Sequence, residues 1–262
     1  MIKILNLNKI YEIPINELNI IKKLFLFKKF LNLRSKNKFY SLKEINLEIF
    51  NKDIVFVIGP SSSGKSTLFS ILSKKIDYEV GQIFMSNNFF SATLIRMPPN
   101  LIPGLKIKDY VKTLISFILK NEVKNLDLLV SKVFELMNLD KKNQEKPFYE
   151  FDIFFFKNLI LALACFSKAK IFLFDNFKLN FKDKIFLKVF AKYLKNNCNA
   201  SHLFFGCNRL DIIKRYSSKI LIMDHGRIVK FDKKEKFEDE EILKYIRSQN
   251  ENDEFMEDDD EI

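Results

Sequence analysis

Nine consecutive residues combine glycine, lysine and hydroxyl side chains at a spacing suited to phosphate binding. They fit the pattern G-x-x-x-x-G-K-[ST] in full: Gly59, Pro60, Ser61, Ser62, Ser63, Gly64, Lys65, Ser66 and Thr67. The two glycines permit the torsions that let backbone N–H groups surround phosphate oxygens. Lys65 is placed to reach the β- and γ-phosphates of a nucleotide, and the Ser66 hydroxyl to bind Mg²⁺. The segment is therefore predicted to be a phosphate-binding loop.

The elements needed to position such a loop lie on both sides of it. Residues 54–58, IVFVI, are continuously apolar and end at Gly59, as expected of a parallel-sheet strand buried on both faces. Residues 66–75 place apolar side chains at helical spacing. A strand, a loop and a helix N-terminus therefore follow one another, and the helix adds a partial positive charge at the phosphates.

A second oxygen ligand for Mg²⁺ is predicted at Asp175. It follows residues 171–174, IFLF, another apolar run typical of a buried strand. A carboxylate at the end of such a strand is the metal ligand that a phosphate loop requires. The expected cofactors are therefore ATP and Mg²⁺.

The remaining pattern predicts an α/β fold with a mostly parallel core sheet. Further strands are expected at residues 2–7, 42–49, 203–205 and 220–223, and helices within 107–140. The most apolar stretch, 151–166, contains Asp152 and Lys157 and is too short to span a bilayer.

Charge is unevenly distributed along the chain. The 262 residues carry a formal net charge of +11, yet residues 238–262 hold twelve acids against Lys244 and Arg247. Residues 237–262 are therefore expected to form an acidic, disordered tail. The basic remainder suits anionic lipid, nucleic acid or acidic partners, or an ordinary lysine-rich surface. The three cysteines show no metal spacing and are expected to be reduced thiols.

Several segments resemble the ATP-binding-cassette family. Residues 41–49 look like that family's strand leading to the phosphate loop, and Gly81 falls where its first lobe closes. Residues 101–107 resemble the segment after its Q-loop, and residues 218–229 its late hairpin. The resemblance covers residues 1–232, and the insertion at 12–40 is loosely similar to that of the polysaccharide and teichoic-acid exporter ATPases.

The resemblance carries expectations about organisation and partners. It implies an ABC-type nucleotide-binding domain over 1–236, with an antiparallel N-terminal β region and a helical lobe at about 99–165. Tyr11 matches the aromatic residue that stacks on adenine, although a packed surface tyrosine is the alternative. The basic insertion 12–40 is either a membrane- or partner-binding helix or a surface insertion. An integral membrane permease, a homo- or heterodimer, and a cytoplasmic location at a membrane face are also implied.

The departures from the family concern catalysis. No glycine occurs between Gly104 and Gly206, so the glycine-containing signature loop has no counterpart; its place is residues 151–155. Asn176 occupies the position of the catalytic glutamate, and an amide cannot accept a proton from water. Cys207 occupies the position of the switch histidine, and Met97 that of the Q-loop glutamine. His202 and His225 are both expected to be surface or turn residues.

These residues favour an ATP-binding subunit of a transporter with weak or absent hydrolysis. A non-transport relative that acts on nucleic acid or in complex assembly is the alternative, but no groove motif with interleaved aromatic and basic residues supports it. A small-molecule kinase fits poorly, because of the late hairpin and the length between the two phosphate-site motifs.

Overall fold

The computed structural model describes residues 1–12, 38–91, 104–119, 125–175, 184–205, 207 and 209–257. They belong to two compact units. The first unit comprises residues 1–49, 56–85 and 208–262, and the second comprises residues 50–55 and 86–207. Most of the 12–40 insertion, together with Met97 and Asn176, lies outside the described residues.

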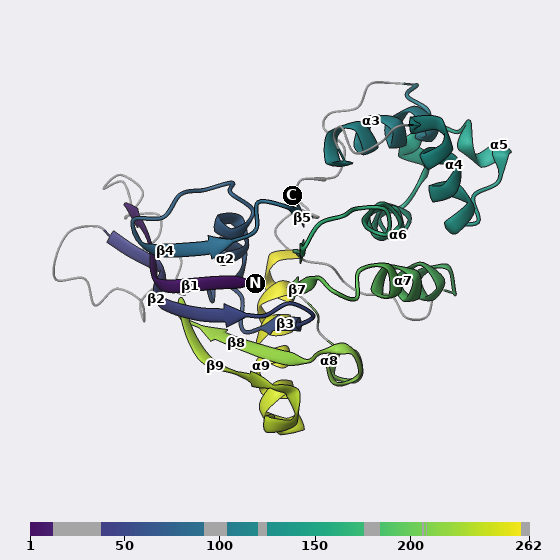
Figure 1. Cartoon of the computed structure of the whole chain (residues 1–262). Coiled ribbons are helices and arrows are strands. Elements are labelled where there is room, and N and C mark those ends of the chain that lie inside the picture. The colour runs from purple at the N-terminus through teal and green to yellow at the C-terminus, as the bar shows by residue number, and fades with distance from the viewer. Residues whose placement is uncertain are drawn as a thin grey trace. The chain divides into compact units, whose positions relative to one another are not determined.

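The first unit contains an antiparallel sheet with the strand order β2-β1-β4 (Figure 1). Its strands are β1 Ile2–Glu12, β2 Lys38–Ile49 and β4 Val80–Met85. Ile4 pairs with Leu47 on one side and Ile83 on the other. In β2, Ile45, Leu47 and Ile49 alternate inward and are buried. The predicted antiparallel N-terminal region is thus confirmed.

The buried strand before the phosphate loop is β3 Ile54–Ile58, with the predicted bounds. Its last residues lie beside β8 Lys219–Asp224, which forms an antiparallel hairpin with β9 Arg227–Lys233. His225 and Gly226 make the hairpin turn with φ of 46° and 74°. His225 is thus the turn residue that the sequence predicts.

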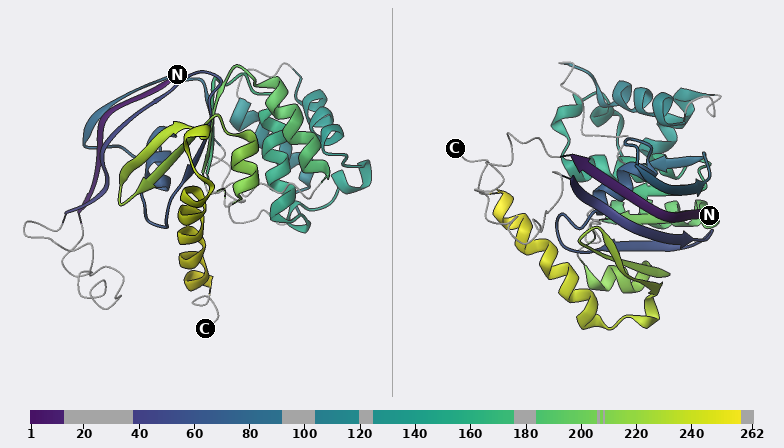
Figure 2. Two further views of the ribbon diagram at one scale, coloured as in Figure 1. Left: turned by 90° about the horizontal axis from the view of Figure 1, so that it is seen from below. Right: turned by 90° about the vertical axis from the view of Figure 1, so that its left-hand side faces the viewer.

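The described residues of the first unit also form three helices and a short 3₁₀ turn. They are α2 Lys65–Leu72, α8 Leu210–Tyr216, α9 Asp239–Glu257 and the turn η5 Lys234–Lys236. Figure 2 shows α9 as a long, continuous helix in two further views. The disordered tail predicted from residue 237 is therefore corrected over 239–257, while residues 258–262 lie outside the description.

The second unit is built on parallel strands. β5 Phe89–Ser91, β6 Ile171–Phe174 and β7 Ser201–Phe205 pair in that order, with Phe90 beside Phe172 and Phe172 beside His202. The first residues of β3 continue this sheet beside β7. The parallel core that the sequence predicts is therefore confirmed.

The described residues of the second unit also form several helices. They are α3 Ile107–Leu119, α4 Leu126–Leu136, α5 Lys141–Gln144, α6 Ile153–Ala164, α7 Lys184–Asn196 and the 3₁₀ turn η4 Phe148–Glu150. Aromatic rings from strands and helix meet in the core: Phe174 stacks on Phe204 with centroids 4.9 Å apart, and Tyr193 of α7 meets Phe174 edge-on at 5.5 Å.

No helix in the described part of the chain combines the length and apolar character needed to cross a lipid bilayer.

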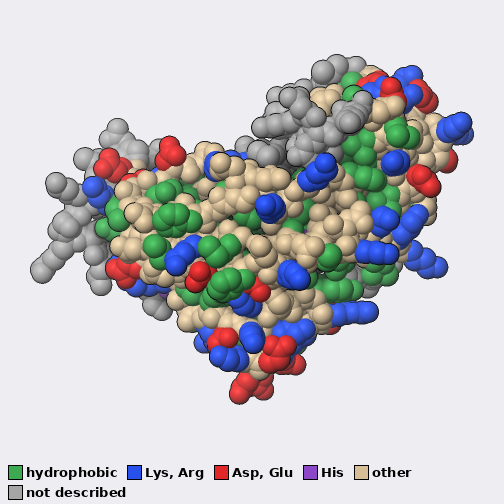
Figure 3. All heavy atoms as spheres, viewed as in Figure 1, with side chains coloured by type: hydrophobic (Ala, Val, Ile, Leu, Met, Phe, Trp, Pro, Cys, Tyr) green, Lys and Arg blue, Asp and Glu red, His purple; other side chains and the backbone are tan. Residues whose placement is uncertain are grey.

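Figure 3 shows Lys and Arg side chains spread over the visible face, with Asp and Glu side chains among them.

Candidate functional site

The phosphate loop connects β3 to α2 inside the first unit. At Gly59, φ is 151° and a Cβ would lie 2.0 Å from the backbone oxygen of Met223 in β8. At Gly64, φ is 95° and a Cβ would lie 2.6 Å from the Ser41 oxygen. Both positions therefore exclude any larger residue, because a side chain would collide with rigid backbone. All nine predicted loop residues are brought together here.

The loop directs its positive charge inward. The Lys65 ammonium donates to the Gly59 oxygen at 2.8 Å, the Pro60 oxygen at 2.7 Å and the Ser63 Oγ at 3.1 Å. No side chain caps the N-terminus of α2, where Gly64 is the capping residue. The first-turn N–H groups of this helix and the lysine thus present donors to an anion, as a phosphate site requires.

The two hydroxyl residues after Lys65 differ in their surroundings. Thr67 Oγ1 is hydrogen-bonded to Ser41 Oγ of β2 at 2.7 Å, which ties the helix to the strand. Ser66 is exposed. Because Mg²⁺ prefers oxygen ligands, the Ser66 hydroxyl fits the role predicted for it, while Thr67 has a structural partner.

A cavity of about 250 Å³ opens beside the loop. Its described lining consists of Phe39, Ser41, Ser62, Ser63, Gly64, Lys65, Ser66 and Thr67. Sequence reasoning missed Phe39 and Ser41. The register of β1 and β2 shifts at Ser41, which lies between the paired residues Tyr40 and Leu42, so strand alternation does not relate the two side chains and no spacing signal could have found them. Tyr11, the residue expected against adenine, is not among these lining residues and is 41% exposed.

The other predicted site residues belong to the second unit. Asp175 directly follows β6, after four fully buried residues, as the sequence predicts. A carboxylate at a strand end is an oxygen ligand of the kind that suits Mg²⁺. Cys207 is buried and carries no disulfide, like Cys165 and the exposed Cys198.

The position expected for the signature loop is occupied by the start of α6. The Asp152 carboxylate caps this helix by accepting from the Phe155 N–H at 2.7 Å. The following residues, Ile153 and Phe154, are exposed apolar side chains. A carboxylate at this helix N-terminus repels a phosphate group, so α6 lacks the chemistry of an anion site.

His202 corrects the sequence prediction of a surface or turn position. It is 2% exposed and lies in β7, where Phe172 stacks on its ring. Nε2 faces the Asn197 oxygen at 3.1 Å, so Nε2 carries the proton and Nδ1 accepts from the Tyr193 hydroxyl. Burial lowers the pKa of His202 to about 4, and the imidazole is therefore neutral at physiological pH.

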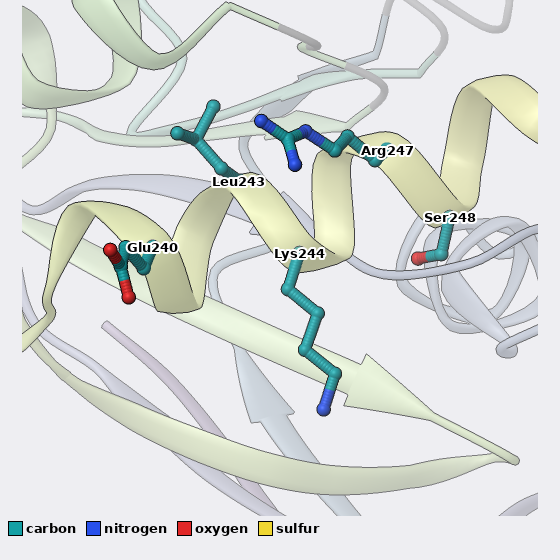
Figure 4. A pocket seen from close by; sticks show the side chains of 5 residues that line it. All are labelled: Glu240, Leu243, Lys244, Arg247 and Ser248. Atoms are coloured by element: carbon teal, nitrogen blue, oxygen red, sulfur yellow. The ribbon is translucent and has the colours of Figure 1, made fainter.

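A second hollow, of about 640 Å³, lies along α9 and is lined by Glu240, Leu243, Lys244, Arg247 and Ser248. Figure 4 shows Leu243 and Arg247 on one side of the helix and Lys244 on the other. These charged groups do not converge on one point. The larger hollow is thus a weaker candidate site than the cavity beside the phosphate loop.

In this structure a strand of a parallel sheet leads into a loop with glycine and lysine, and the loop leads into a helix. This arrangement is that of a P-loop nucleotide-binding protein. Residues 42–177 match the sequence profile of the ABC transporter family, and the chain belongs to that family. The ATP-binding-cassette resemblance drawn from the sequence is thereby confirmed.

The proteins that resemble this chain in sequence include ATP-binding proteins. The chain is 27% identical over 197 residues to the ATP-binding protein Uup of Buchnera aphidicola, covering 72% of this chain and 32% of Uup. It is 33% identical over 78 residues to the spermidine/putrescine import ATP-binding protein PotA of Fusobacterium nucleatum, covering 28% of this chain and 20% of PotA. The chain thus spans about a third or less of the length of these relatives.

Solved structures confirm the fold. The dimeric ATP-binding cassette MJ0796 bound to ADP and Pi has a TM-score of 0.66 at 17% identity, covering 89% of this chain and 98% of that one. The ADP conformation of the cassette MJ1267 has a TM-score of 0.64 at 16% identity, covering 95% and 97%.

Proposed function

We propose that this chain is an ATP-binding subunit of an ABC transporter that binds Mg-ATP at the phosphate loop and hydrolyses it weakly or not at all. The open cavity beside Lys65 and Ser66, next to the uncapped start of α2, is the observation that carries the proposal. In this site the lysine and helix amides hold the phosphates, and the Ser66 hydroxyl supplies an oxygen ligand for Mg²⁺. Bound Mg²⁺ neutralises charge on the phosphates.

Weak hydrolysis follows from the residues that would have to act on water and on the γ-phosphate. Asn176 offers an amide where a general base is needed, and Cys207 is a buried thiol. Loss of a general base costs a factor of roughly 10² to 10⁴ in rate. The capped, aromatic start of α6 adds a second loss, since it offers no glycine amides to a partner's nucleotide.

The transporter role rests on family membership and on named relatives. PotA is an import protein, and the glutamine transport ATP-binding protein GlnQ of Geobacillus stearothermophilus is 40% identical over 55 residues, covering 20% of this chain and 23% of GlnQ. The chain then couples nucleotide occupancy to a separate membrane permease. It acts as a homo- or heterodimer at the cytoplasmic face of a membrane.

The test is Mg-ATP binding with single-turnover hydrolysis on the purified chain. We expect binding without appreciable turnover in the wild type, and loss of binding in Lys65→Ala, because the ammonium contacts the phosphates. Lys142→Ala, an exposed lysine of α5, is the matched control and should bind normally. Turnover at ordinary ATPase rates that needs no partner would contradict weak catalysis. Absence of wild-type binding would contradict the nucleotide site itself.

A second candidate, a non-transport role on nucleic acid or in complex assembly, is favoured by one observation. α7 carries Lys184, Lys188, Lys192 and Lys195 on its exposed side and no acidic residue. The structure shows none of these lysines in an ion pair with a described acidic residue, although Lys188 donates to the Asn138 Oδ1 at 2.7 Å. Such a face could attract a polyanion.

A further inference from the structure

The turn between β8 and β9 contacts the phosphate loop through its backbone. His225 and Gly226 form a two-residue turn in which both φ values are positive, at 46° and 74°, and Asp224 pairs with Arg227 across it. The Gly226 N–H donates to the Ser63 oxygen at 3.1 Å. The turn therefore binds a carbonyl of the loop directly, although the two segments are far apart in the sequence.

This hydrogen bond bears on anion binding because of how a phosphate loop works. Backbone N–H groups of the loop must point at the phosphate oxygens, and a carbonyl that accepts from another segment is directed away from them. Ser63 is buried, and a buried backbone carbonyl without a donor costs free energy. The Gly226 N–H supplies that donor, so it helps to fix the orientation of the peptide that follows Ser63.

The turn and the loop also share a neighbour, the Ser41 oxygen of β2. A Cβ at Gly64 would lie 2.6 Å from this oxygen, and a Cβ at Gly226 would lie 2.7 Å from it. The Gly226 oxygen accepts from the Lys43 N–H at 2.8 Å, which fixes the turn to the same strand. These contacts join backbone atoms, so a displacement of the turn is transmitted to the loop.

We propose that Gly226 is a positioning residue of the nucleotide site, which holds the phosphate loop in its anion-binding conformation. The inference rests on the proposed nucleotide site, and Gly226 acts on it through Ser63 and Ser41. A side chain at residue 226 would combine a strained positive φ with a collision against backbone, so the turn, β2 and the loop would have to shift. Because coupling is reciprocal, a bound polyphosphate stabilises the turn in return.

Gly81 of β4 provides a matched control in the same unit. Its φ is 114°, and a Cβ there would lie 2.7 Å from both the Asn6 oxygen and the Leu7 Cα of β1. Gly81→Ala therefore reproduces the strain and the collision of Gly226→Ala, but against β1 instead of the phosphate loop.

The experiment measures dissociation constants of Mg-ATP and Mg-tripolyphosphate by calorimetry, together with urea unfolding, for the wild type and three variants. Gly226→Ala should weaken both ligands equally and by at least about 10-fold, the value of one hydrogen bond to a charged group. Gly81→Ala should lose at least as much stability and still bind both ligands like the wild type. His225→Gly should also bind normally, since glycine adopts the positive φ of the turn.

Hydrogen exchange on the wild type covers the case in which Gly226→Ala does not fold. It compares the amide of Gly226 with that of Phe237, which donates to the Lys234 oxygen in a separate turn. Mg-tripolyphosphate at 100 times its dissociation constant should slow exchange at Gly226 by up to about 100-fold, and by more than at Phe237.

Three outcomes would overturn the role of Gly226 while leaving the phosphate site intact. They are wild-type affinities in Gly226→Ala, an equal loss of affinity in Gly81→Ala, and exchange at Gly226 that the ligand slows no more than at Phe237. By contrast, a wild type that binds neither ATP nor tripolyphosphate would refute the proposed function on which the inference rests.

Discussion

Among single residues, His202 shows how burial sets the charge state of a side chain. Its ring is enclosed by Phe172 and Tyr193, and both nitrogens have partners within the second unit. Protonating Nδ1 would remove the acceptor of the Tyr193 hydroxyl and bury an uncompensated charge. The neighbouring Cys165 thiol is also buried, which raises its pKa to about 12 and leaves it unreactive at neutral pH.

We predict that stability decreases as the pH falls from 7 to 5 because of His202. The pKa of this imidazole is about 4 when folded, against 6.5 for an unperturbed histidine, so the unfolded chain binds the proton first. The stabilisation that the neutral His202 contributes is fully present above pH 6.5 and is lost as the pH falls towards 4. Linkage gives a loss of about 2 kcal/mol between pH 7 and pH 5, measurable by urea unfolding.

Two histidine variants test this pH dependence. His202→Gln should flatten the pH profile, since no group then titrates at that position. His225→Gln should keep the wild-type profile, because His225 is an exposed turn residue. An unchanged slope in His202→Gln would mean that other groups cause the effect.

At the scale of elements, α9 shows how two apolar residues outweigh a strongly acidic composition. Ile242 and Ile246 lie one turn apart on its buried side, and the helix packs against α8. Two ion pairs hold its first turn: Lys230 meets Glu241 at 2.6 Å and Lys214 meets Asp239 at 2.5 Å. The acidic residues at this end also suit the positive N-terminus of the helix.

Ile242→Ala is therefore expected to destabilise the protein by about 2 to 4 kcal/mol, the usual cost of such a cavity in a core. Lys244→Ala, an exposed position on the same helix, should change stability by less than about 0.5 kcal/mol. Thermal or urea unfolding of both variants gives the comparison. Similar stabilities would show that α9 does not contribute to the folded core of the first unit.

For the whole molecule, charge bears on the choice between the two candidate functions. The second unit has 20 basic against 11 acidic residues, a net of +9, whereas the first has 24 against 22. Part of this charge is locally paired, as in Lys106 with Glu145 and Lys112 with Asp127. The lysines of α7 remain the basic face that a nucleic acid would contact.

We expect a transporter subunit to bind nucleic acid weakly. The measurement is the salt dependence of its affinity for duplex DNA, which reports contacts to the phosphates. A face that neutralised four phosphates through α7 would give a slope of about −4 in a log–log plot of affinity against salt. We expect a much smaller slope, unaffected by the double change Lys188→Glu and Lys192→Glu. A steep slope that this change removes would instead favour the second candidate.

Local signals in the sequence determined the phosphate loop, the strands around it and the position of Asp175. Gly59, Gly64 and Lys65 could be predicted because the torsions and donors they supply belong to a short segment of chain. The apolar runs of β3 and β6 were also readable, since strands buried on both faces have no polar positions.

Only the tertiary structure decided the features that depend on residues distant in the sequence. Phe39 lines the cavity because Ser41 ties β2 to α2, a contact that no spacing rule reveals. His202 is buried because Tyr193 and Asn197 surround it from α7 and the turn after it. α9 is ordered because two isoleucines pack, whereas the sequence signal was dominated by charge. Burial and pairing are set by the partners that the fold supplies, and composition alone does not contain them.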